Sequence, residues 1–398
     1  MTSKQLLVDI SELVKKDHKT GVQRVVRAIL LQLLRQPPED FCVEPVYFCK
    51  RIYSNKKYRY ARSFTTGFTG NLNAKILKSN RLRYQVGDIF FGLDLCHEVV
   101  LRQKDFYQKL RHAGVKVYFL VYDLLPILRG DYFPQGTSTR HQNWLQIVAE
   151  NDGVICISKA VADEFTTWLA ENAPEKLPTL KVRWFHLGAD IENSVPTMGM
   201  PKNAEQVLKK LSPNMTFLMV GTIEPRKGQV QTLAAFEKIW AEENSIILAI
   251  IGKQGWMMDV FIEKLRSHPE LGSRLFWLEG LSDEYMEKIY AVSDGLIMAS
   301  EGEGFGLPLI EAARHRLPII ARDISVFREI AGEHAYYFSG LSAEALALSI
   351  TQWINLKKMD SIPKSDNIPW LTWEQSTKQL IDALLPSHQT TENKEIIS

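Results

Sequence analysis

The sequence predicts an α/β protein of two domains, each built around a parallel sheet. Short runs rich in Val, Ile, Phe and Leu alternate with longer stretches of helical periodicity over most of the chain, which is typical of parallel α/β sheets. The alternation occurs in both halves. The chain has 398 residues, and at roughly 150 residues per domain this length favours two hydrophobic cores over one.

The apolar runs place the expected strands. In the first half they cover residues 6–10, 43–48, 88–92, 116–122, 153–157 and 182–185. In the second half they cover residues 216–220, 246–251, 275–278, 295–298, 318–320 and 335–338. Ligands of α/β proteins bind beyond the carboxyl ends of such strands, so the segments that directly follow them are the first candidates for a site.

The two series of strands are separated by residues 191–213, which contain three prolines and no strand signal. This composition is typical of a linker between domains. We therefore expect a first domain over residues 1–195 and a second over residues 210–365. A lone helix over residues 370–386 follows a segment with two prolines and fits as a cap on either domain.

The composition, with 45% hydrophobic and 24% charged residues, is that of a soluble globular protein. A formal net charge of +2 is nearly neutral, so it gives no argument for a nucleic-acid or strongly acidic partner, and no nucleic acid is expected. The longest apolar stretches fall short of the ~20 residues that cross a bilayer. The N-terminus lacks the three-part pattern of a secretory signal, so we expect a cytoplasmic location.

Cysteine and histidine spacing predicts no metal site. The cysteines form no CxxC pair and are expected to be buried, reduced thiols; they are Cys42, Cys49, Cys96 and Cys156. No two histidines have HxxxH or comparable spacing. We interpret His97, His112 and His186 as structural.

The strongest local signal is the segment Glu301-Gly-Glu-Gly-Phe-Gly-Leu-Pro-Leu-Ile-Glu311, directly after an expected strand. Its three glycines let a ligand approach the backbone closely, and Pro308 suits the first turn of a helix. A glycine-lined helix N-terminus at the carboxyl end of a strand offers N–H groups and the positive end of a dipole to a phosphate. The spacing is not the GxGxxG fingerprint of dinucleotide dehydrogenases.

Two carboxylates, Glu303 and Glu311, flank this expected phosphate site. A carboxylate beside an anion is unfavourable unless it has other partners, so we interpret both as acceptors for sugar or ribose hydroxyls. The alternative is a plain strand-to-helix turn with two solvated glutamates.

A second signal, Val220-Gly-Thr-Ile-Glu-Pro-Arg-Lys-Gly228, also follows an expected strand. The helix after it has an apolar face, which places Arg226 and Lys227 near its N-terminal end. Basic residues there oppose the helix dipole unless an anion is close, and a diphosphate would supply that anion. Two solvated surface bases are the alternative.

A third signal, Lys19–Arg27, contains Thr20 and Gln23 at the spacing of a capping box. Gly21 is then expected in a loop that faces the cleft. Arg24 and Arg27 fall off the apolar face of the helix, where they either meet an acceptor phosphate or remain solvated.

Two further segments leave both interpretations open. Asp123 follows a strongly apolar strand, where an aspartate either does polar work in a cleft or starts a turn. Residues 50–62 and 74–84 mix Lys and Arg with Tyr. We expect a solvated loop at 50–62, with contact to anionic headgroups or to a lipid-linked phosphate as the alternative.

Taken together, these segments resemble family 4 glycosyltransferases. GEGFGLPLIEA resembles the family's motif of two glutamates separated by seven residues, and VGTIEPRKG resembles its diphosphate loop. LEGLSDEYMEKIYAVSDGLIMAS, WFHLGAD and PWLTWEQSTKQL are similar to other segments of the family. The opening DISELVKKDHKTGVQRVVR is similar to a bacterial subgroup that includes mannosyltransferases of surface-polysaccharide assembly.

The resemblance implies a GT-B fold, with two Rossmann-like domains facing a central cleft and the last helix crossing back onto the first. It implies a retaining transfer of a hexose, with mannose from GDP-mannose as the leading donor, to a glycan acceptor that is free or lipid-linked. The pathway implied is O-antigen or capsule synthesis, on a cytoplasmic protein that is either free or peripheral to the inner membrane. It also implies that no metal or other cofactor is required.

Site roles carry over residue by residue. Glu303 is expected to contact the donor hexose, Glu311 the ribose, and Arg226 with Lys227 the diphosphate. The remaining donor contacts are expected from Gly21, Thr222, Gly304, Phe305, Gly306 and Leu307, and Asp123 completes the expected catalytic set.

The chain departs from the family at two positions. Thr222 stands where many members have Arg, which shifts the charge onto Arg226 and Lys227. Tyr122 stands where many relatives carry a His before the Asp. Alternatives to transfer are an epimerase or phosphorylase acting on the same fold, and a non-catalytic protein that binds nucleotide sugars.

Overall fold

The structure is a computed structural model that describes residues 3–17, 20–49, 57–69, 82–190, 196–242 and 245–385. The chain divides into two compact units. Unit 1 comprises Met1–Ile127, Ser138–Gly188 and Leu371–Ser398, and unit 2 comprises Leu128–Thr137 and Ala189–Trp370. The change of unit near residue 188 lies just before the segment that the sequence marks as a linker.

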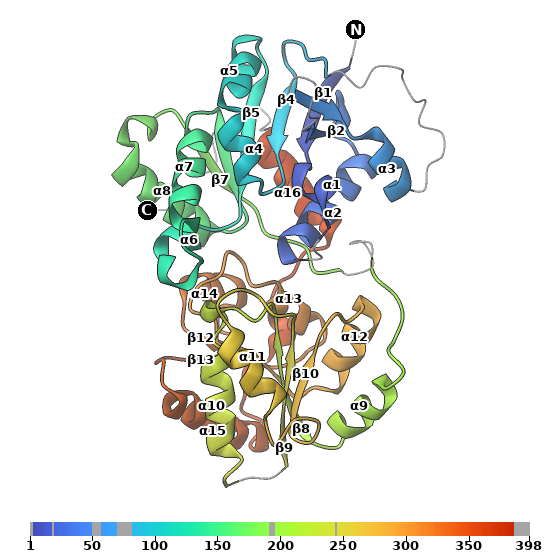
Figure 1. Ribbon diagram of the computed structural model, residues 1–398, viewed down its shortest axis with the longest axis vertical. Helices are drawn as coiled ribbons and strands as arrows, with labels where there is room; N and C mark the ends of the chain where they lie inside the picture. Colours follow the sequence, from blue (N-terminus) through green and yellow to red (C-terminus); the bar gives the residue numbers. More distant parts are fainter. Residues whose placement is uncertain are drawn as a thin grey trace. The chain divides into compact units, whose positions relative to one another are not determined.

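Unit 1 contains a seven-stranded sheet with the order β3-β2-β1-β4-β5-β6-β7. Its strands are β1 (Lys4–Asp9), β2 (Phe41–Cys49), β3 (Lys57–Tyr60), β4 (Ile89–Gly92), β5 (Lys116–Val121), β6 (Gly153–Cys156) and β7 (Lys181–Trp184). All neighbours are parallel except the pair of β2 and β3. The six strands expected in this half are present, and β1, β2, β4, β5 and β7 are labelled in Figure 1.

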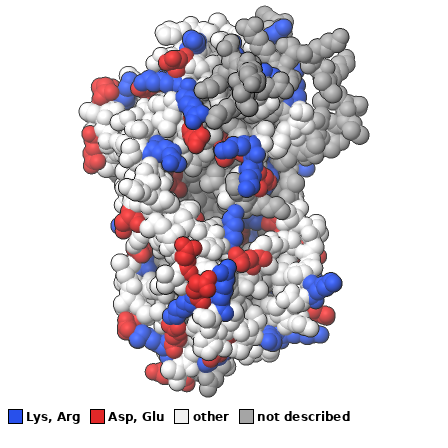
Figure 2. Space-filling model, in the orientation of Figure 1, with Lys and Arg blue, Asp and Glu red and all other residues white. Residues whose placement is uncertain are grey.

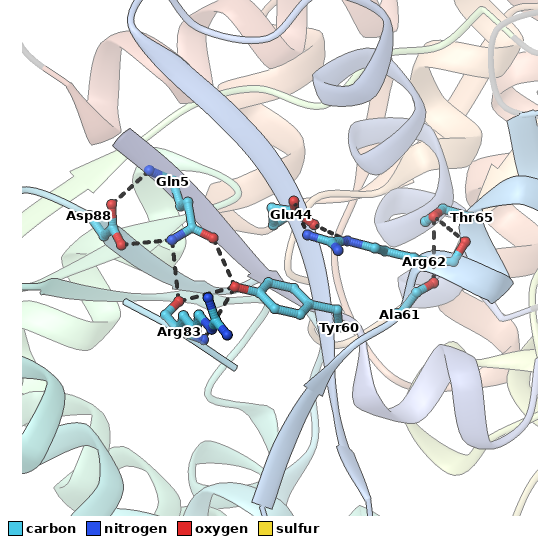
Figure 3. A network of polar contacts seen from close by, with 8 residues as sticks. All are labelled: Gln5, Glu44, Tyr60, Ala61, Arg62, Thr65, Arg83 and Asp88. Atoms are coloured by element: carbon cyan, nitrogen blue, oxygen red, sulfur yellow. Dashed lines mark hydrogen bonds and ion pairs between the residues drawn. The ribbon is translucent and has the colours of Figure 1, made fainter. Parts of the chain in front are cut away.

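Strand β3 was not expected, because its four residues lie in the basic stretch that the sequence analysis assigned to a solvated loop. The side chains of Tyr58 and Tyr60 are buried. The Tyr60 hydroxyl lies within hydrogen-bond distance of two acceptors, Gln5 Oε1 at 3.0 Å and the Arg83 carbonyl oxygen at 3.1 Å (Figure 3). The loop interpretation is wrong for Lys57–Tyr60, since cross-strand pairing and aromatic burial outweigh the exposed charges. Residues 50–56 and 70–81 lie outside the described residues.

The positive charge of Arg62, beside β3, is paired within the fold. Arg62 donates to both carboxylate oxygens of Glu44, at 2.6 and 3.1 Å, and its guanidinium lies over the Tyr60 ring (Figure 3). A two-pronged pair of this kind fixes both side chains. The tyrosines at 58 and 60 and the arginine at 62 therefore hold the edge of the sheet, and their rings are not available to a membrane surface.

Helices connect the strands of unit 1. They are α1 (Ser11–Lys15), α2 (Gly21–Arg35), α3 (Arg62–Thr69), α4 (His97–Arg102), α5 (Lys104–His112), α6 (Leu125–Leu128), α7 (Thr137–Ala149), α8 (Lys159–Asn172) and α16 (Trp373–Leu384). The core is an apolar cluster that includes Phe90, Phe119, Trp144 and Phe165, all at most 1% exposed.

The last helix, α16, returns to unit 1. Thr372 and Gln375 form a capping box at its start, and α16 packs against α2. Ser376 donates to the His186 carbonyl at 2.7 Å. Gly188 touches the helix start so closely that a Cβ there would lie 2.6 Å from the Trp373 nitrogen. The backbone contact therefore requires glycine at this position.

Unit 2 contains a six-stranded, fully parallel sheet with the order β10-β9-β8-β11-β12-β13. Its strands are β8 (Met215–Val220), β9 (Ile246–Ile251), β10 (Leu275–Leu278), β11 (Gly295–Met298), β12 (Ile319–Arg322) and β13 (Tyr336–Phe338). Its helices are α9 (Ala204–Leu211), α10 (Gln229–Ile239), α11 (Asp259–Arg266), α12 (Asp283–Val292), α13 (Leu307–Arg314), α14 (Ser325–Ala331) and α15 (Ala343–Lys358). All six expected strands are present in this half.

Two features of unit 2 differ from the expected linker and domain. The segment 191–213 contains helix α9, whose residues Ala204, Val207 and Leu211 are buried at helical spacing. The short segment Leu128–Thr137 clusters with unit 2, although the expected first domain runs through it. Among the contacts of this segment with the rest of unit 2 is a hydrogen bond that the Trp256 indole donates to the Tyr132 carbonyl at 2.7 Å.

Each sheet has a point where the strand order reverses. In unit 1 it lies between β1 and β4, and in unit 2 between β8 and β11. Crevices at the carboxyl ends of such strands are the usual ligand sites of open α/β sheets. The segments that follow these four strands therefore have the best placement for function.

Charges are mixed on the molecular surface. On the face that Figure 2 shows, Lys and Arg are interspersed with Asp and Glu over both units. This agrees with the net charge of +2 and gives that face no single-sign field. Within the described residues, no helix combines the length and apolar character that crossing a bilayer requires.

Candidate functional site

The candidate site lies where the segments after β8 and β11 meet in unit 2. After β8 the chain forms the short 3₁₀ helix Pro225–Lys227 and then Gly228, which has φ of +75° and precedes α10. A Cβ on Gly228 would lie 2.5 Å from the Ala299 carbonyl oxygen. The Glu301 amide also donates to the Arg226 carbonyl at 2.8 Å. Glycine and this backbone bond lock the two segments together.

Arg226 and Lys227 converge on the glycine-rich loop after β11. Arg226 Nη1 donates to the Gly302 carbonyl at 2.8 Å and to Glu303 Oε2 at 3.2 Å. Lys227 Nζ pairs with Glu303 Oε1 at 2.5 Å. The two basic side chains thus lie at one point, next to Gly304, as the interpretation of a shared anion site requires.

Glu303 is the centre of this cluster. Its side chain is 8% exposed and accepts a third bond, from the Ser300 hydroxyl at 2.7 Å. Burial by itself raises the pKa of Glu303, but the charges of Lys227 and Arg226 and the bonds from Lys227 and Ser300 outweigh it and lower the pKa to about 2. The carboxylate is therefore ionised at neutral pH.

A second carboxylate, Glu224, lies on the other side of Arg226. Its Oε2 is 3.1 Å from Arg226 Nε, and the residue is 6% exposed. The two cations, Arg226 and Lys227, are thus matched by the two carboxylates Glu224 and Glu303. Attraction for a diphosphate must therefore include the neighbouring backbone amides as well as the side-chain charges.

The N-terminus of α13 supplies those amides. Gly306 precedes the helix with φ of +92°, and no side chain caps the helix start. Gly304, Phe305 and Gly306 are buried, and Leu307 is half-buried. The first N–H groups of a helix have no acceptor inside it, and they carry the positive end of the dipole. The arrangement has the features that a phosphate site requires, and the phosphate contact itself stays a prediction.

Glu311 sits inside α13 and is 6% exposed. The Tyr290 hydroxyl donates to its Oε2 at 2.7 Å. The Tyr290 ring in turn stacks on His315, with centroids 5.0 Å apart. The solvated-glutamate alternative is therefore wrong for Glu311, and its contact with a ribose stays a prediction.

The expected residues of the first half lie in unit 1. Gly21 is the first residue of α2, with Thr20 accepting from the Gln23 amide, so the loop expected at Gly21 is wrong because the cap starts the helix there. Arg27 pairs with Asp17 at 2.6 Å. Asp123 Oδ1 accepts from the Leu125 amide at 3.1 Å, which is the turn-starting role.

Tyr122 and Thr222, the two departures from the family pattern, are both built into the fold. The Tyr122 hydroxyl is buried and donates to the Leu93 carbonyl at 2.9 Å. The Thr222 carbonyl accepts from the Gln229 amide group at 3.1 Å, and Thr222 itself lies beside Gly221 at the end of β8. A direct role of either side chain toward a ligand stays a prediction.

Arg322 was not expected from the sequence as part of this region. This residue ends β12, is 6% exposed, and donates to the carbonyls of Ala299 and Gly340 at 3.0 and 2.7 Å. It also donates to Gln231 Oε1 at 2.5 Å. Arg322 thereby ties the end of β11 to two other segments of the carboxyl edge. A charged residue that closes an apolar strand was the available signal.

Glu301 and Tyr132 were also missed as a pair. The Tyr132 hydroxyl donates to Glu301 Oε2 at 2.7 Å, and Phe133 stacks on Trp256 with centroids 5.5 Å apart. Burial, followed by the bond to Glu301, raises the pKa of Tyr132 to about 12. The spacing of 169 residues between the partners leaves no signal in the sequence.

No grouping of three or more His, Cys, Asp or Glu side chains suited to a metal occurs within the described ranges. Cys96 and Cys156 are buried thiols as expected, but Cys49 is half-buried and Cys42 is exposed, so the expected burial is wrong for Cys42, which lies on β2 near the edge of the sheet. Burial is the first cause that raises the pKa of the Cys96 and Cys156 thiols. Metal independence stays a prediction.

Comparison with known proteins agrees with this geometry. Residues 201–366 match the family described as Glycosyl transferases group 1. The matched residues lie within unit 2, and this part of the chain is similar to that glycosyltransferase family; the chain has the GT-B fold.

Two curated relatives carry the comparison to particular proteins. The chain is 44% identical to a serotype-specific mannosyltransferase, WbdA, of Escherichia coli over 386 residues, which cover 96% of this chain and 46% of the relative. It is 27% identical to the O-antigen chain mannosyltransferase B of Escherichia coli over 42% of this chain and 44% of that protein. The chain thus spans about half the length of these relatives.

Solved structures show the same fold at low identity. Anabaena HepE in complex with UDP and glucose has a TM-score of 0.64 at 14% identity, covering 96% of this chain and 100% of that one. Sucrose-phosphate synthase from Thermosynechococcus elongatus has a TM-score of 0.64 at 16% identity, covering 95% and 97%.

Proposed function

We propose that the chain transfers a hexose from a nucleotide sugar to a glycan, with retention of configuration at the transferred carbon. Mannose from GDP-mannose is the leading donor, because the curated relatives are named as mannosyltransferases. The acceptor is a growing glycan of O-antigen or capsule type, free or lipid-linked. The observation that carries the proposal is the convergence of Arg226 and Lys227 on Glu303 beside the uncapped start of α13.

The chemistry follows from where negative charge develops. As the bond between sugar and diphosphate breaks, charge accumulates on the leaving phosphate, and donors aimed at it lower the barrier by several kcal/mol. Arg226, Lys227 and the first amides of α13 are such donors. Since Glu303 already holds both cations, the diphosphate takes over part of their bonding, and the Glu303 oxygens so released accept hydroxyls of the hexose.

Further parts of the proposal concern conditions and partners. The reaction needs no metal, since the first amides of α13, together with Arg226 and Lys227 once the diphosphate displaces Glu303, balance the diphosphate charge. Glu311 and Tyr290 hold the ribose side of the donor, and Asp123 acts in the acceptor half. The protein works in the cytoplasm, on acceptors at or near the inner membrane.

The test is a thermal-shift screen of the full chain against GDP, UDP, ADP and dTDP and their sugars, followed by mass detection of product with mannose-containing acceptors. We expect GDP and GDP-mannose to raise the melting temperature, and mass gain of one hexose on the acceptor. EDTA should leave the rate unchanged. No mass gain with any donor and acceptor contradicts transfer.

The alternatives give different products. An epimerase changes the donor sugar without any acceptor, and a phosphorylase releases a sugar phosphate only when phosphate is added. A non-catalytic binder shows the thermal shift without turnover.

A charge-matched pair of variants locates the site. Lys227→Met should reduce turnover by about 100-fold or more, because it removes a donor to the leaving phosphate. Lys238→Met removes the same charge at the far end of α10, where Lys238 pairs with Glu344 on the surface, and should behave like the wild type.

A further inference from the structure

A chain of two histidines and a carbonyl lies at the carboxyl edge of the unit 1 sheet. His97 follows β4 and begins α4, His141 lies on α7, and Asp123 follows β5. His97 Nε2 is 2.8 Å from His141 Nδ1, and His141 Nε2 is 3.1 Å from the Asp123 carbonyl oxygen. Strands β4 and β5 are neighbours, and β4 borders the point where the strand order reverses.

The carbonyl fixes the proton on each ring. A carbonyl only accepts, so His141 Nε2 carries the hydrogen, and a neutral imidazole then leaves Nδ1 as an acceptor. His97 Nε2 must donate to that nitrogen, which leaves His97 Nδ1 with a free lone pair. The hydrogen bond to the Asp123 carbonyl therefore determines, through His141, that His97 Nδ1 is unprotonated.

Both rings stay neutral at physiological pH. Burial is the main cause that lowers the pKa of His97 to about 4, helped by the charges of His141 and Arg140 and opposed by those of Asp123 and Glu12. Burial likewise lowers the pKa of His141 to about 4, against the bond to Asp123. The Nδ1 lone pair of His97 is thus available over the whole physiological range.

The position of His97 suits a ligand contact. The Trp144 ring packs against both histidines, with centroids 5.5 and 5.1 Å away, so the His97 ring is held in place. His141 is 1% exposed, whereas His97 is half-buried. His97 Nδ1 has no hydrogen-bond partner in the described part of the chain, and it is not among the enclosed polar atoms that lack one. The nitrogen is therefore not fully enclosed by the described residues.

We propose that His97 Nδ1 accepts a hydrogen bond from a hydroxyl group of the acceptor saccharide, and that His141 is the residue that positions it. This rests on the proposed transfer reaction and adds an acceptor subsite in unit 1. A sugar hydroxyl donates readily to an imidazole nitrogen, and an ordered, neutral acceptor recognises it without the desolvation cost of a carboxylate.

The first experiment reads the ring directly, without turnover. The imidazole nitrogens of the full chain are labelled with ¹⁵N, and their shifts are measured with and without an α-linked mannotriose. We expect the free chain to show His97 protonated at Nε2, and the saccharide to move the Nδ1 resonance of His97 while leaving His112 unmoved. A His97 ring protonated at Nδ1, or an Nδ1 resonance that the saccharide does not shift, overturns the inference.

The second experiment uses two isosteric variants. His97→Gln places an amide near the former Nε2 and keeps a donor to His141, but lacks a group at Nδ1. His97→Asn places an amide oxygen near Nδ1 and loses the bond to His141. The control is His112→Gln, at the exposed end of α5.

With tagged mannotriose as acceptor, we expect His97→Gln to raise the acceptor KM about tenfold or more, because one hydroxyl is left without its acceptor. The donor KM should not change. His97→Asn should recover part of the acceptor KM. Equal acceptor KM values for His97→Gln and the wild type overturn the inference, as does a loss in His97→Asn as large as in His97→Gln.

Failure of the proposed function has its own signature. If the wild type transfers no hexose from any donor, the transfer reaction is wrong. The ¹⁵N shift of His97 then still decides whether a saccharide occupies this subsite.

Discussion

At the scale of single residues, the site is governed by charge balance around Glu303. Two cations and two carboxylates meet after β8 and β11, and Glu303 shares in the pairing of both cations. A diphosphate must compete with Glu303 for Arg226 and Lys227. In the proposed reaction, Glu303 therefore weakens the binding of the bare diphosphate and supplies the carboxylate that contacts the sugar.

This balance gives an unusual expectation for Glu303→Gln. Removing the negative charge frees Arg226 and Lys227, so GDP without a sugar should bind about fivefold more tightly. Turnover should fall by about 100-fold or more, since the carboxylate no longer contacts the hexose. Isothermal titration with GDP and a transfer assay measure the two effects. Weaker GDP binding in the variant contradicts the competition.

At the scale of secondary-structure elements, the most consequential contact is that of α16 with unit 1. The helix belongs to the C-terminal end of the sequence, yet it is held by the segment that closes the first half of the chain, through Arg183, His186 and Gly188. A lone helix was expected here from the sequence, and the family resemblance implied that it crosses back onto the first domain. Its individual contacts could not be predicted, because they depend on where β7 ends.

Replacing Gly188 tests this contact. A Cβ at this position meets the backbone of Trp373 at 2.6 Å, and backbone does not move aside as a side-chain tip does. Gly188→Ala should therefore destabilise unit 1 by about 1–3 kcal/mol. Hydrogen exchange should show faster exchange of the α16 amides, while the amides of β8 and β11 keep their protection. Unchanged exchange in α16 contradicts the close approach.

At the scale of the whole molecule, the two units are expected to respond differently to acid. Burial raises the pKa of Asp9 to about 6 and of Asp94 to about 7, and lowers the pKa of His97 and His141 to about 4. Below about pH 7 the folded carboxyls keep protons that the unfolded chain has released, so acidification stabilises unit 1 through them. Acidification destabilises unit 1 through the two histidines, because the unfolded chain binds these protons at a higher pH than the folded chain does.

These opposing contributions leave unit 1 little changed between about pH 7 and about pH 4. In unit 2 the pKa of Glu303 is about 2, against an ordinary value of 4.5. The ionised Glu303 stabilises folded unit 2 at pH values above the pKa of glutamate in the unfolded chain. This stabilisation is lost as the pH falls through the pKa of Glu303 in the folded chain. Unit 2 should therefore unfold first in acid.

Calorimetry of the full chain checks both units at once, with the transition that GDP raises assigned to unit 2. Asp94→Asn keeps an acceptor for the Leu13 amide, which Asp94 holds at 2.7 Å, but removes the proton uptake. Relative to the wild type, its unit 1 transition should lose on the order of 3 kcal/mol between about pH 7 and pH 4. A constant difference between variant and wild type over that range contradicts the raised pKa.

Much of the fold could be predicted because parallel strands that are buried on both faces have continuous apolar runs in their sequence. All twelve expected strands are present. Strand β3 was not predicted, because it is a short edge strand in which two tyrosines alternate with charged residues, and it has no continuous apolar run. Helix α9 escaped for a related reason, since flanking prolines masked its helical spacing. Local patterns identify elements that bury one repeating face, and they fail where burial comes from distant partners.

The sequence by itself determined the fold class, the two glycine-rich segments, and the presence of Arg226, Lys227 and Glu303 in them, because glycine, proline and charge placed after a strand act through the local backbone. The tertiary structure decided that the two segments touch and that Glu303 is ionised between two cations. It also decided which ring nitrogens of His97 and His141 carry hydrogen, through the bond to the Asp123 carbonyl. These properties depend on burial and on distances between residues far apart in the chain, and no local pattern encodes either.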